Sequence, residues 1–186
     1  GQKDVLGRWR WIDELVTEDM GAVRFGELLA SKTRSEYQGF KILGVQGDPS
    51  GDARSQVDER TPFEVLKAAG INAEPAPTND FMLRRESVAV CLNRMIDGQP
   101  GLTISPKCVM TRKGMGGGYN YKRVQVSGDE RFHDKPDKNK YSHPCEAAQY
   151  MMIGAGEGKA LVGSPRADFH KPIDYTKIQH VSRGFV

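Results

Sequence analysis

The sequence predicts a mixed α/β fold in which helices pack against a β-sheet. Two observations lead to this class: strand-like segments lie near both ends of residues 1–158, and amphipathic, helix-like segments lie between them. A length of 186 residues with 38% hydrophobic residues suits one domain with its own core. Reacting groups in such sheets usually lie beyond the carboxyl ends of the strands, so a functional site is expected there.

Several short segments carry these signals in the first part of the chain. Trp9 and Trp11 alternate with arginines, which predicts a strand with one buried face. Thr17 is expected to cap a following helix, because Met20, Val23, Leu28 and Leu29 recur at helical spacing. The apolar run 40–47 predicts a buried strand that ends at a DPSG turn, which places Asp48 at its carboxyl end.

The rest of the chain shows similar start and stop signals. Pro62 and Gly70 bound a short helix, and an apolar stripe that includes Cys91 predicts a longer one over 78–96. Further predicted elements are strands at 71–76 and 102–104, a glycine-rich segment at 114–118 leading into a hairpin around 127–129, a charged loop at 135–141, and a last helix over 144–153. Residues 159–186 are expected to form a flexible tail.

Charge and hydropathy exclude few classes of function. The net charge of +3 is too small to indicate a polyanionic partner, although local basic clusters could bind one. No apolar run approaches the ~20 residues of a membrane span, and the N-terminus lacks a signal-like stretch. The three cysteines, Cys91, Cys108 and Cys145, are too few for a disulfide framework and lack the close pairs of zinc sites. An intracellular, reducing compartment is therefore expected.

Two acids are candidates for chemistry. Asp48, on a rigid strand end, would suit a hard divalent cation, although DPSG is also ordinary turn chemistry. Glu146 could face the sheet from the last helix beside Tyr150, although an acid near a helix start is also favoured by the helix dipole. These acids are distant in the sequence and can converge only through the fold, as in paired metal sites.

An ordered series of motifs surrounds the two acids. The motifs are GDPSG at 47–51, PAPTND at 75–80, DGQPGL at 97–102, GGYNYK at 117–122, PDKNKYSHPCEAAQY at 136–150 and GAGEG at 154–158. This series resembles the nuclease domain of the large terminase subunit, the DNA-packaging protein of tailed bacteriophages, over most of residues 7–158.

The resemblance implies an RNase H-like nuclease domain over residues 1–158. In that family a cluster of acids binds two Mg²⁺ or Mn²⁺ ions, which activate a water for attack on a phosphodiester and stabilise the departing 3′ oxygen. Asp48 corresponds to the second acid, and Glu146 stands where the family more often carries Asp. The first acid, ahead of a segment like QKD at 2–4, has no counterpart here, so part of the first strand is expected to be absent. Asp13 or Glu14 could substitute for it; the alternative is a solvated pair at a strand end.

The resemblance also implies a biological setting. The domain would cut concatemeric double-stranded DNA during genome packaging, in the cytoplasm of the infected host cell. In the full-length protein its partners would be an ATPase domain, the small terminase subunit and the portal protein. No Gly-x-x-x-x-Gly-Lys-Ser/Thr string occurs in these residues, so the ATPase motor is expected to be absent from this chain.

Basic residues near the predicted strand ends could contact DNA phosphates from loops or a polar helix face. They are Arg54, Arg84, Arg85, Arg112, Lys113, Lys122, Arg123, Lys138 and Lys140. Scattered solvated surface is the alternative for each. Tyr119 and Tyr121 could stack on bases or pack on a strand face. Two other functions stay open: a DNA- or portal-docking module without catalysis, and another nuclease of the same fold, such as a junction resolvase.

Overall fold

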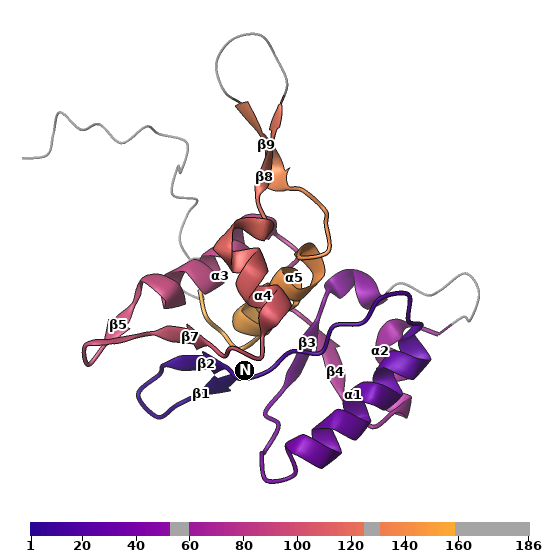
Figure 1. Cartoon of the computed structure of the whole chain (residues 1–186). Coiled ribbons are helices and arrows are strands. Elements are labelled where there is room, and N and C mark those ends of the chain that lie inside the picture. Colours follow the sequence, from indigo (N-terminus) through magenta and orange to yellow (C-terminus); the bar gives the residue numbers. More distant parts are fainter. Residues whose placement is uncertain (53–59, 125–130, 159–186) are drawn as a thin grey trace, which may run out of the picture.

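The computed structural model describes residues 1–52, 60–124 and 131–158, which form a mixed α/β structure with small sheets (Figure 1). A three-stranded sheet has the order β1 (Gln2–Lys3), β2 (Trp9–Trp11) and β7 (Leu102–Ile104), with β1 antiparallel and β7 parallel to β2. A separate parallel pair consists of β3 (Val45–Gly47) and β4 (Ala73–Pro75). The predicted mixed α/β class is confirmed, with its strands divided among several sheets.

Five α-helices lie in the described part of the chain. They are α1 (Ala22–Glu36), α2 (Pro62–Ala68), α3 (Phe81–Asn93), α4 (Val109–Lys113) and α5 (Ser142–Gly154). Helix α5 packs against α3, α4 and β3, while α1 packs against α2. None of these helices is long and apolar enough to cross a bilayer.

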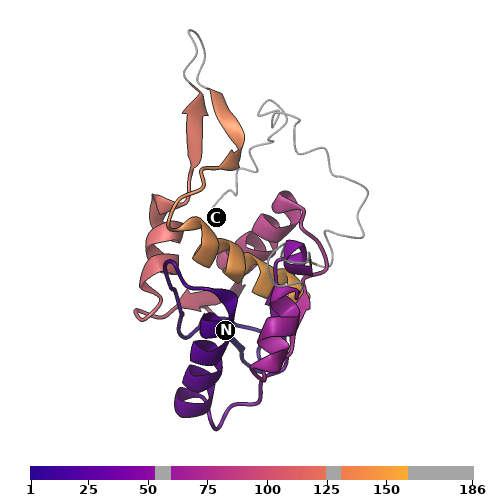
Figure 2. The same ribbon diagram turned by 90° about the vertical axis from the view of Figure 1, so that its right-hand side faces the viewer.

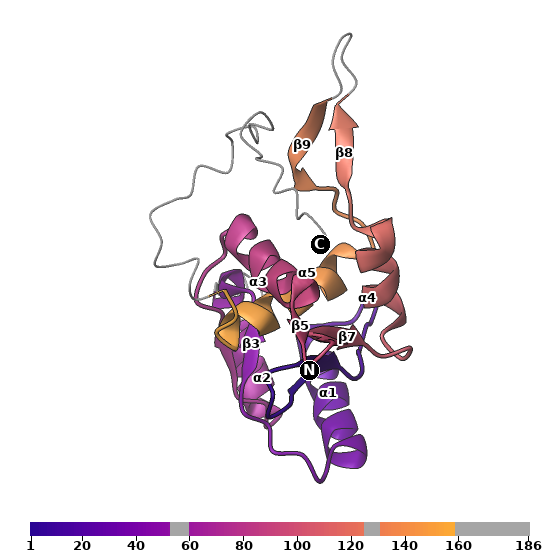
Figure 3. The ribbon, with the colours of Figure 1, turned by 90° about the vertical axis from the view of Figure 1, so that its left-hand side faces the viewer.

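Two antiparallel hairpins complete the described structure. One pairs β5 (Met95–Ile96) with β6 (Gln99–Pro100), and the other pairs β8 (Tyr121–Val124) with β9 (Arg131–Pro136). The β8–β9 hairpin projects away from the helices in all three views (Figures 1, 2 and 3). Its predicted turn around 127–129 and the predicted tail at 159–186 lie outside the described residues.

The core explains why the tryptophan alternation predicts a strand correctly. Trp9 and Trp11 are buried on one face of β2, whereas Arg10 between them is exposed. They pack with residues of α3, β7 and α5, and the cluster comprises Trp9, Trp11, Val88, Cys91, Leu102, Cys108, Ala148 and Met152. All three cysteines are buried and unpaired.

Two of the predicted boundaries are wrong. The first helix begins after Gly21 and not after Thr17, because Asp19 has a positive φ of 51° that a right-handed helix cannot contain. In the predicted strand over 40–47, only Val45–Gly47 pairs with a neighbour, and Phe40 and Leu43 are exposed. Their hydrophobicity alone therefore did not make residues 40–44 part of a sheet.

The glycine run leading to the hairpin is helical rather than extended. Residues Gly114–Gly118 form a π-helical turn that continues α4 and is kinked at Gly117, which has a φ of 121°. A side chain on Gly114 would collide with the Cys145 Sγ, and one on Gly118 would lie 2.7 Å from the Tyr141 ring. The glycines therefore allow this turn to lie directly against the start of α5, which carries Glu146.

Contacts near the end of α5 fix it to two sheets. Gly154 lies directly against the Gln46 side chain of β3, so closely that a Cβ at this position would overlap it. After the helix, the buried Glu157 carboxylate accepts hydrogen bonds from Trp9 Nε1 at 2.8 Å and Lys3 Nζ at 2.7 Å. Arg94 lies 3.6 Å from its other oxygen. We call Glu157, Trp9, Lys3 and Arg94 the Glu157 cluster.

Candidate functional site

Asp48 lies directly after β3, as predicted from the sequence. Its Oδ1 accepts a hydrogen bond from the Ser50 backbone N–H at 2.9 Å, at the start of the 3₁₀ turn Pro49–Asp52. Burial alone would raise the pKa of Asp48, but contacts from Ser50 and Tyr150 and the charge on Arg84 outweigh it and lower the pKa below its ordinary value. Asp48 is therefore a turn residue that stays ionised beside α5.

Tyr150 on α5 links the two candidate acids. It is one helical turn after Glu146, so the two side chains share a face of the helix. Its buried hydroxyl donates a hydrogen bond to Asn79 Oδ1 at 2.6 Å. Burial raises the pKa of Tyr150, and the neighbouring charges on Asp48 and Glu146 raise it further. The strand β3 that precedes Asp48 packs against α5, so the two sequence-distant acids lie on neighbouring elements.

Glu146 is largely buried, which excludes the alternative of a solvated acid near a helix start. Its side chain is 12% exposed, and Oε1 accepts a hydrogen bond from the Tyr119 hydroxyl at 2.9 Å. The Lys138 ammonium lies 2.5 Å from Oε1 and 2.6 Å from Oε2. Burial raises the pKa of Tyr119, and the contact with Glu146 adds to the rise.

Arg84 lies inside this region and not on a polar helix face as predicted. It is 6% exposed, and its guanidinium lies 4.3 Å from the centroid of the Tyr150 ring. One nitrogen donates to Gln149 Oε1 at 3.2 Å, whereas the buried Nε has no hydrogen-bond partner among the described residues. Arg84 is therefore an internal cation whose charge favours the ionised form of Asp48. We call Asp48, Arg84, Tyr119, Glu146 and Tyr150 the acidic site.

The other predicted DNA contacts are on the surface or partly buried. Arg85 pairs with Glu86 and donates to the Tyr121 hydroxyl at 3.1 Å. Lys122 pairs with Asp137 at 3.1 Å, and Lys140 lies over the Tyr141 ring. Arg112 and Lys113 are exposed in the last turn of α4, Arg123 is exposed on β8, and Arg54 lies outside the described residues. Tyr121 packs edge-on against Phe81, as its packing alternative predicted.

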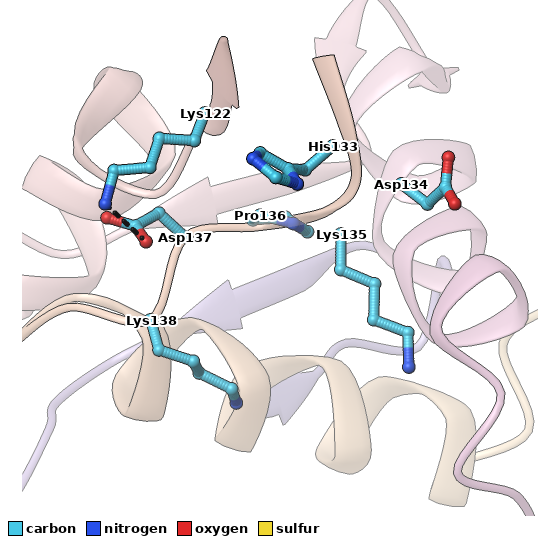
Figure 4. A pocket seen from close by; sticks show the side chains of 7 residues that line it. All are labelled: Lys122, His133, Asp134, Lys135, Pro136, Asp137 and Lys138. Carbon is cyan, nitrogen blue, oxygen red and sulfur yellow. Dashed lines mark hydrogen bonds and ion pairs between the residues drawn. The ribbon is translucent and has the colours of Figure 1, made fainter. Parts of the chain in front are cut away.

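An open depression of about 380 Å³ lies at the base of the β8–β9 hairpin (Figure 4). It is lined by Lys122, His133, Asp134, Lys135, Pro136, Asp137 and Lys138. Its lining carries charges of both signs, and Lys138 joins it to Glu146, which it contacts.

Asp48 and Glu146 are the acids of this region that could take part in binding a divalent cation. Mg²⁺ is commonly bound by one or two carboxylates together with waters and substrate phosphates. Asp48 and Glu146 could provide the carboxylates. Within residues 1–52, 60–124 and 131–158, no group of three or more His, Cys, Asp or Glu side chains could hold a metal ion. In the part of the chain that the structure describes, no third acid therefore completes the cluster that the resemblance implies.

Asp13 and Glu14 do not form the predicted solvated pair. Asp13 contacts Lys32 Nζ at 2.7 Å and the Tyr37 hydroxyl at 2.6 Å. Burial alone would raise the pKa of Asp13, but these contacts outweigh it and lower the pKa to about 2. Glu14 accepts hydrogen bonds from the backbone N–H groups of Met110 and Thr111 at 2.6 and 2.9 Å, at the start of α4. Both acids are occupied by structural contacts, so neither supplies the third ligand.

The Glu14 contact leads to a testable prediction. We expect Glu14→Ala to lower the free energy of unfolding by about 1–2 kcal/mol, because α4 has no other side-chain cap and its first N–H groups would lose their acceptor. Urea unfolding followed by circular dichroism measures the change. Glu18→Ala, at an exposed position, is the control; an equal effect of both substitutions would contradict the capping role.

Parts of this site escaped the sequence-based prediction. The helical spacing of Glu146 and Tyr150 was available as a signal for a shared face. The burial of Arg84 gave no such signal, because its position in α3 does not reveal that α5 covers it. The contact between Lys138 and Glu146 depends on the path of the loop before α5, which the charged composition does not specify.

The described residues form a mixed α/β protein in which the elements that carry Asp48 and Glu146 pack together. No protein-family model, curated protein or solved structure matches the chain. The particular function is therefore argued from the acidic site and from the motif resemblance.

Proposed function

We propose that this chain is a metal-dependent endonuclease domain, related to the nuclease of phage large terminases, that cleaves double-stranded DNA during genome packaging. The observation that supports it most is that β3, which directly precedes Asp48, packs against α5, which carries Glu146. Carboxylates from sequence-distant elements that pack together are the kind of arrangement from which paired metal sites are built. The proposed relation to phage terminases rests on the resemblance of the motifs around both acids.

In this proposal the chain's residues have separate tasks. Asp48 and Glu146 bind the cation, while Ser50 and Tyr119 fix the orientation of the two carboxylates by hydrogen bonds. Arg84 offsets their charge when no cation is bound. A bound Mg²⁺ or Mn²⁺ would polarise the phosphodiester and lower the pKa of an attacking water. The full two-ion mechanism requires a further ligand, which we propose comes from the DNA phosphate or from outside the described residues.

The fold and the partners belong to the same proposal. We propose that the small sheets are parts of an RNase H-like arrangement, with β3 carrying the acid at its carboxyl end. The proposed substrate is concatemeric double-stranded DNA, and the proposed setting is the host-cell cytoplasm. The proposed partners are an ATPase domain, the small terminase subunit and the portal protein. Basic residues at the hairpin base would contact phosphates, which confers little sequence specificity.

Nicking of supercoiled plasmid tests this function. We expect the purified chain to nick plasmid when Mn²⁺ is present and to stop when EDTA is added. Glu27→Gln, an exposed position on α1 away from the acidic site, should cut like the wild type. A chain that binds Mn²⁺ but leaves plasmid intact over a range of metal and salt concentrations would contradict the proposal.

A second candidate is a DNA- or portal-docking module without catalysis. What supports it is that no group of three or more His, Cys, Asp or Glu side chains in the described residues could hold a metal ion. In that case the hairpin surface would bind duplex DNA with an affinity that falls steeply with salt and does not depend on Mn²⁺. Binding to fluorescent duplexes at several salt concentrations measures this, and a preference for branched duplexes would indicate a junction resolvase instead.

A further inference from the structure

The Lys138 ammonium covers both oxygens of the Glu146 carboxylate. Its Nζ lies 2.5 Å from Oε1 and 2.6 Å from Oε2. These are the oxygens that a divalent cation would take in the proposed metal site. We infer that Lys138 is a built-in competitor of the metal, which must leave Glu146 before a cation can bind there. This inference rests on the metal site of the proposed function and adds a control of its occupancy.

The exposures of the two side chains allow such an exchange. Glu146 is 12% exposed and fixed on α5, whereas Lys138 is 67% exposed and can rotate into solvent without opening the core. Exposed ion pairs are weak because water and salt screen them. A divalent cation attracts two carboxylates with twice the charge, so it can displace a single ammonium from one of them.

The loop that carries Lys138 stays in place during the exchange. On one side, the backbone N–H of Asp137 donates to the Asn120 carbonyl at 2.9 Å. On the other, Asn139 Nδ2 donates to the Gly118 carbonyl at 2.9 Å. Figure 4 shows the Lys138 side chain directed away from the neighbouring Lys122–Asp137 pair. Release of the ammonium therefore needs only side-chain rotation. Lys138 remains beside the site, where its ammonium could pair with a DNA phosphate.

Glu146 keeps its orientation when Lys138 leaves. The Tyr119 hydroxyl still donates to Oε1, and this tyrosine is held between the π-helical turn Gly114–Gly118 and α5. Lys138 thus competes with the metal for Glu146 and is not part of the carboxylate's own support. Its removal should expose an oriented ligand and leave the carboxylate in place.

Mn²⁺ binding to the full chain, measured by the electron paramagnetic resonance signal of free Mn²⁺, tests this inference. We expect Lys138→Met to lower the Kd for Mn²⁺ about two- to fivefold, the range that an exposed ion pair is worth. Lys122→Met is the matched control, because Lys122 is 66% exposed and pairs with Asp137 in the same region; its Kd should equal the wild type's. Lys138→Arg keeps the competing cation and should not tighten binding.

The outcomes separate this inference from the proposed function. An equal or higher Kd for Lys138→Met, or no measurable Mn²⁺ binding by either protein, overturns the role of Lys138. Tighter Mn²⁺ binding without plasmid cleavage supports the role of Lys138 and contradicts the nuclease. Cleavage by the wild type with no change of Kd in Lys138→Met supports the nuclease and overturns the competition. Adding Glu146→Gln to Lys138→Met should abolish the gain.

Discussion

Substitution of either acid, as Asp48→Asn or Glu146→Gln, is expected to reduce metal-dependent DNA cleavage about a thousandfold. Each change removes a charged metal ligand. A loss of about 4 kcal/mol of transition-state stabilisation by the metal corresponds to a thousandfold lower rate. Both substitutions preserve shape. The amide oxygen introduced by Asp48→Asn can still accept from Ser50, and the one introduced by Glu146→Gln can still accept from Tyr119. Initial rates of plasmid nicking in Mn²⁺ measure the loss.

Stability and additivity show whether the loss is chemical. The thermal unfolding midpoint of each variant should stay within a few degrees of the wild type, because the turn and α5 keep their hydrogen bonds. The double variant should be no slower than the slower single variant, since two ligands of one ion act as a unit. Multiplied effects of the two substitutions would indicate that the acids work at separate sites, and cleavage that survives either change would exclude that acid as a ligand.

The second large effect concerns the Glu157 cluster. Burial opposes ionisation of Glu157, but contacts with Lys3 and Trp9 outweigh it and lower its pKa from 4.5 to about 2. A carboxylate with a lowered pKa stabilises the folded state above pH 4.5, and this contribution is lost as the pH falls toward 2. We expect Glu157→Gln to cost about 3 kcal/mol of unfolding free energy at neutral pH, and the difference from the wild type to shrink toward pH 2.

Urea unfolding from neutral pH down to about pH 2 measures this dependence. The wild type should lose stability more steeply than Glu157→Gln across the acidic range, and Glu27→Gln should follow the wild type. Asp13, whose pKa is also lowered to about 2, contributes to the same range in every variant and therefore cancels in the comparison. A constant difference between Glu157→Gln and the wild type at all pH values would show that Glu157 stabilises the protein by packing alone.

Local signals predicted much of the secondary structure. Pro62 and Gly70 bound α2 because Thr61 and Glu64 form a reciprocal capping box and Gly70 has a φ of +86°. By contrast, residues 40–44 include Phe40, Ile42 and Leu43 but pair with no strand in the described part of the chain, because pairing depends on the position of β4. The glycine run at 114–118 became helical because it lies against the start of α5, which is a tertiary contact.

The site was predictable only in its acids. A position after a short apolar strand was enough to place Asp48, and helix punctuation was enough to place Glu146. The burial of Arg84, the approach of Lys138 to Glu146 and the use of Glu14 as a cap depend on which elements pack together. Charge patterns cannot separate a surface arginine from one that stacks on a buried tyrosine.

The contact between Gly154 and Gln46 has a consequence for how the two acids are spaced. Gln46 lies on β3, two residues before Asp48, and Gly154 lies at the end of α5, about two turns after Glu146. Because Gly154 has no side chain, α5 can lie directly against β3 at this point. The distance between the two acids of the proposed cation site therefore depends on a residue that is neither of them, because a methyl group at position 154 would overlap the Gln46 side chain.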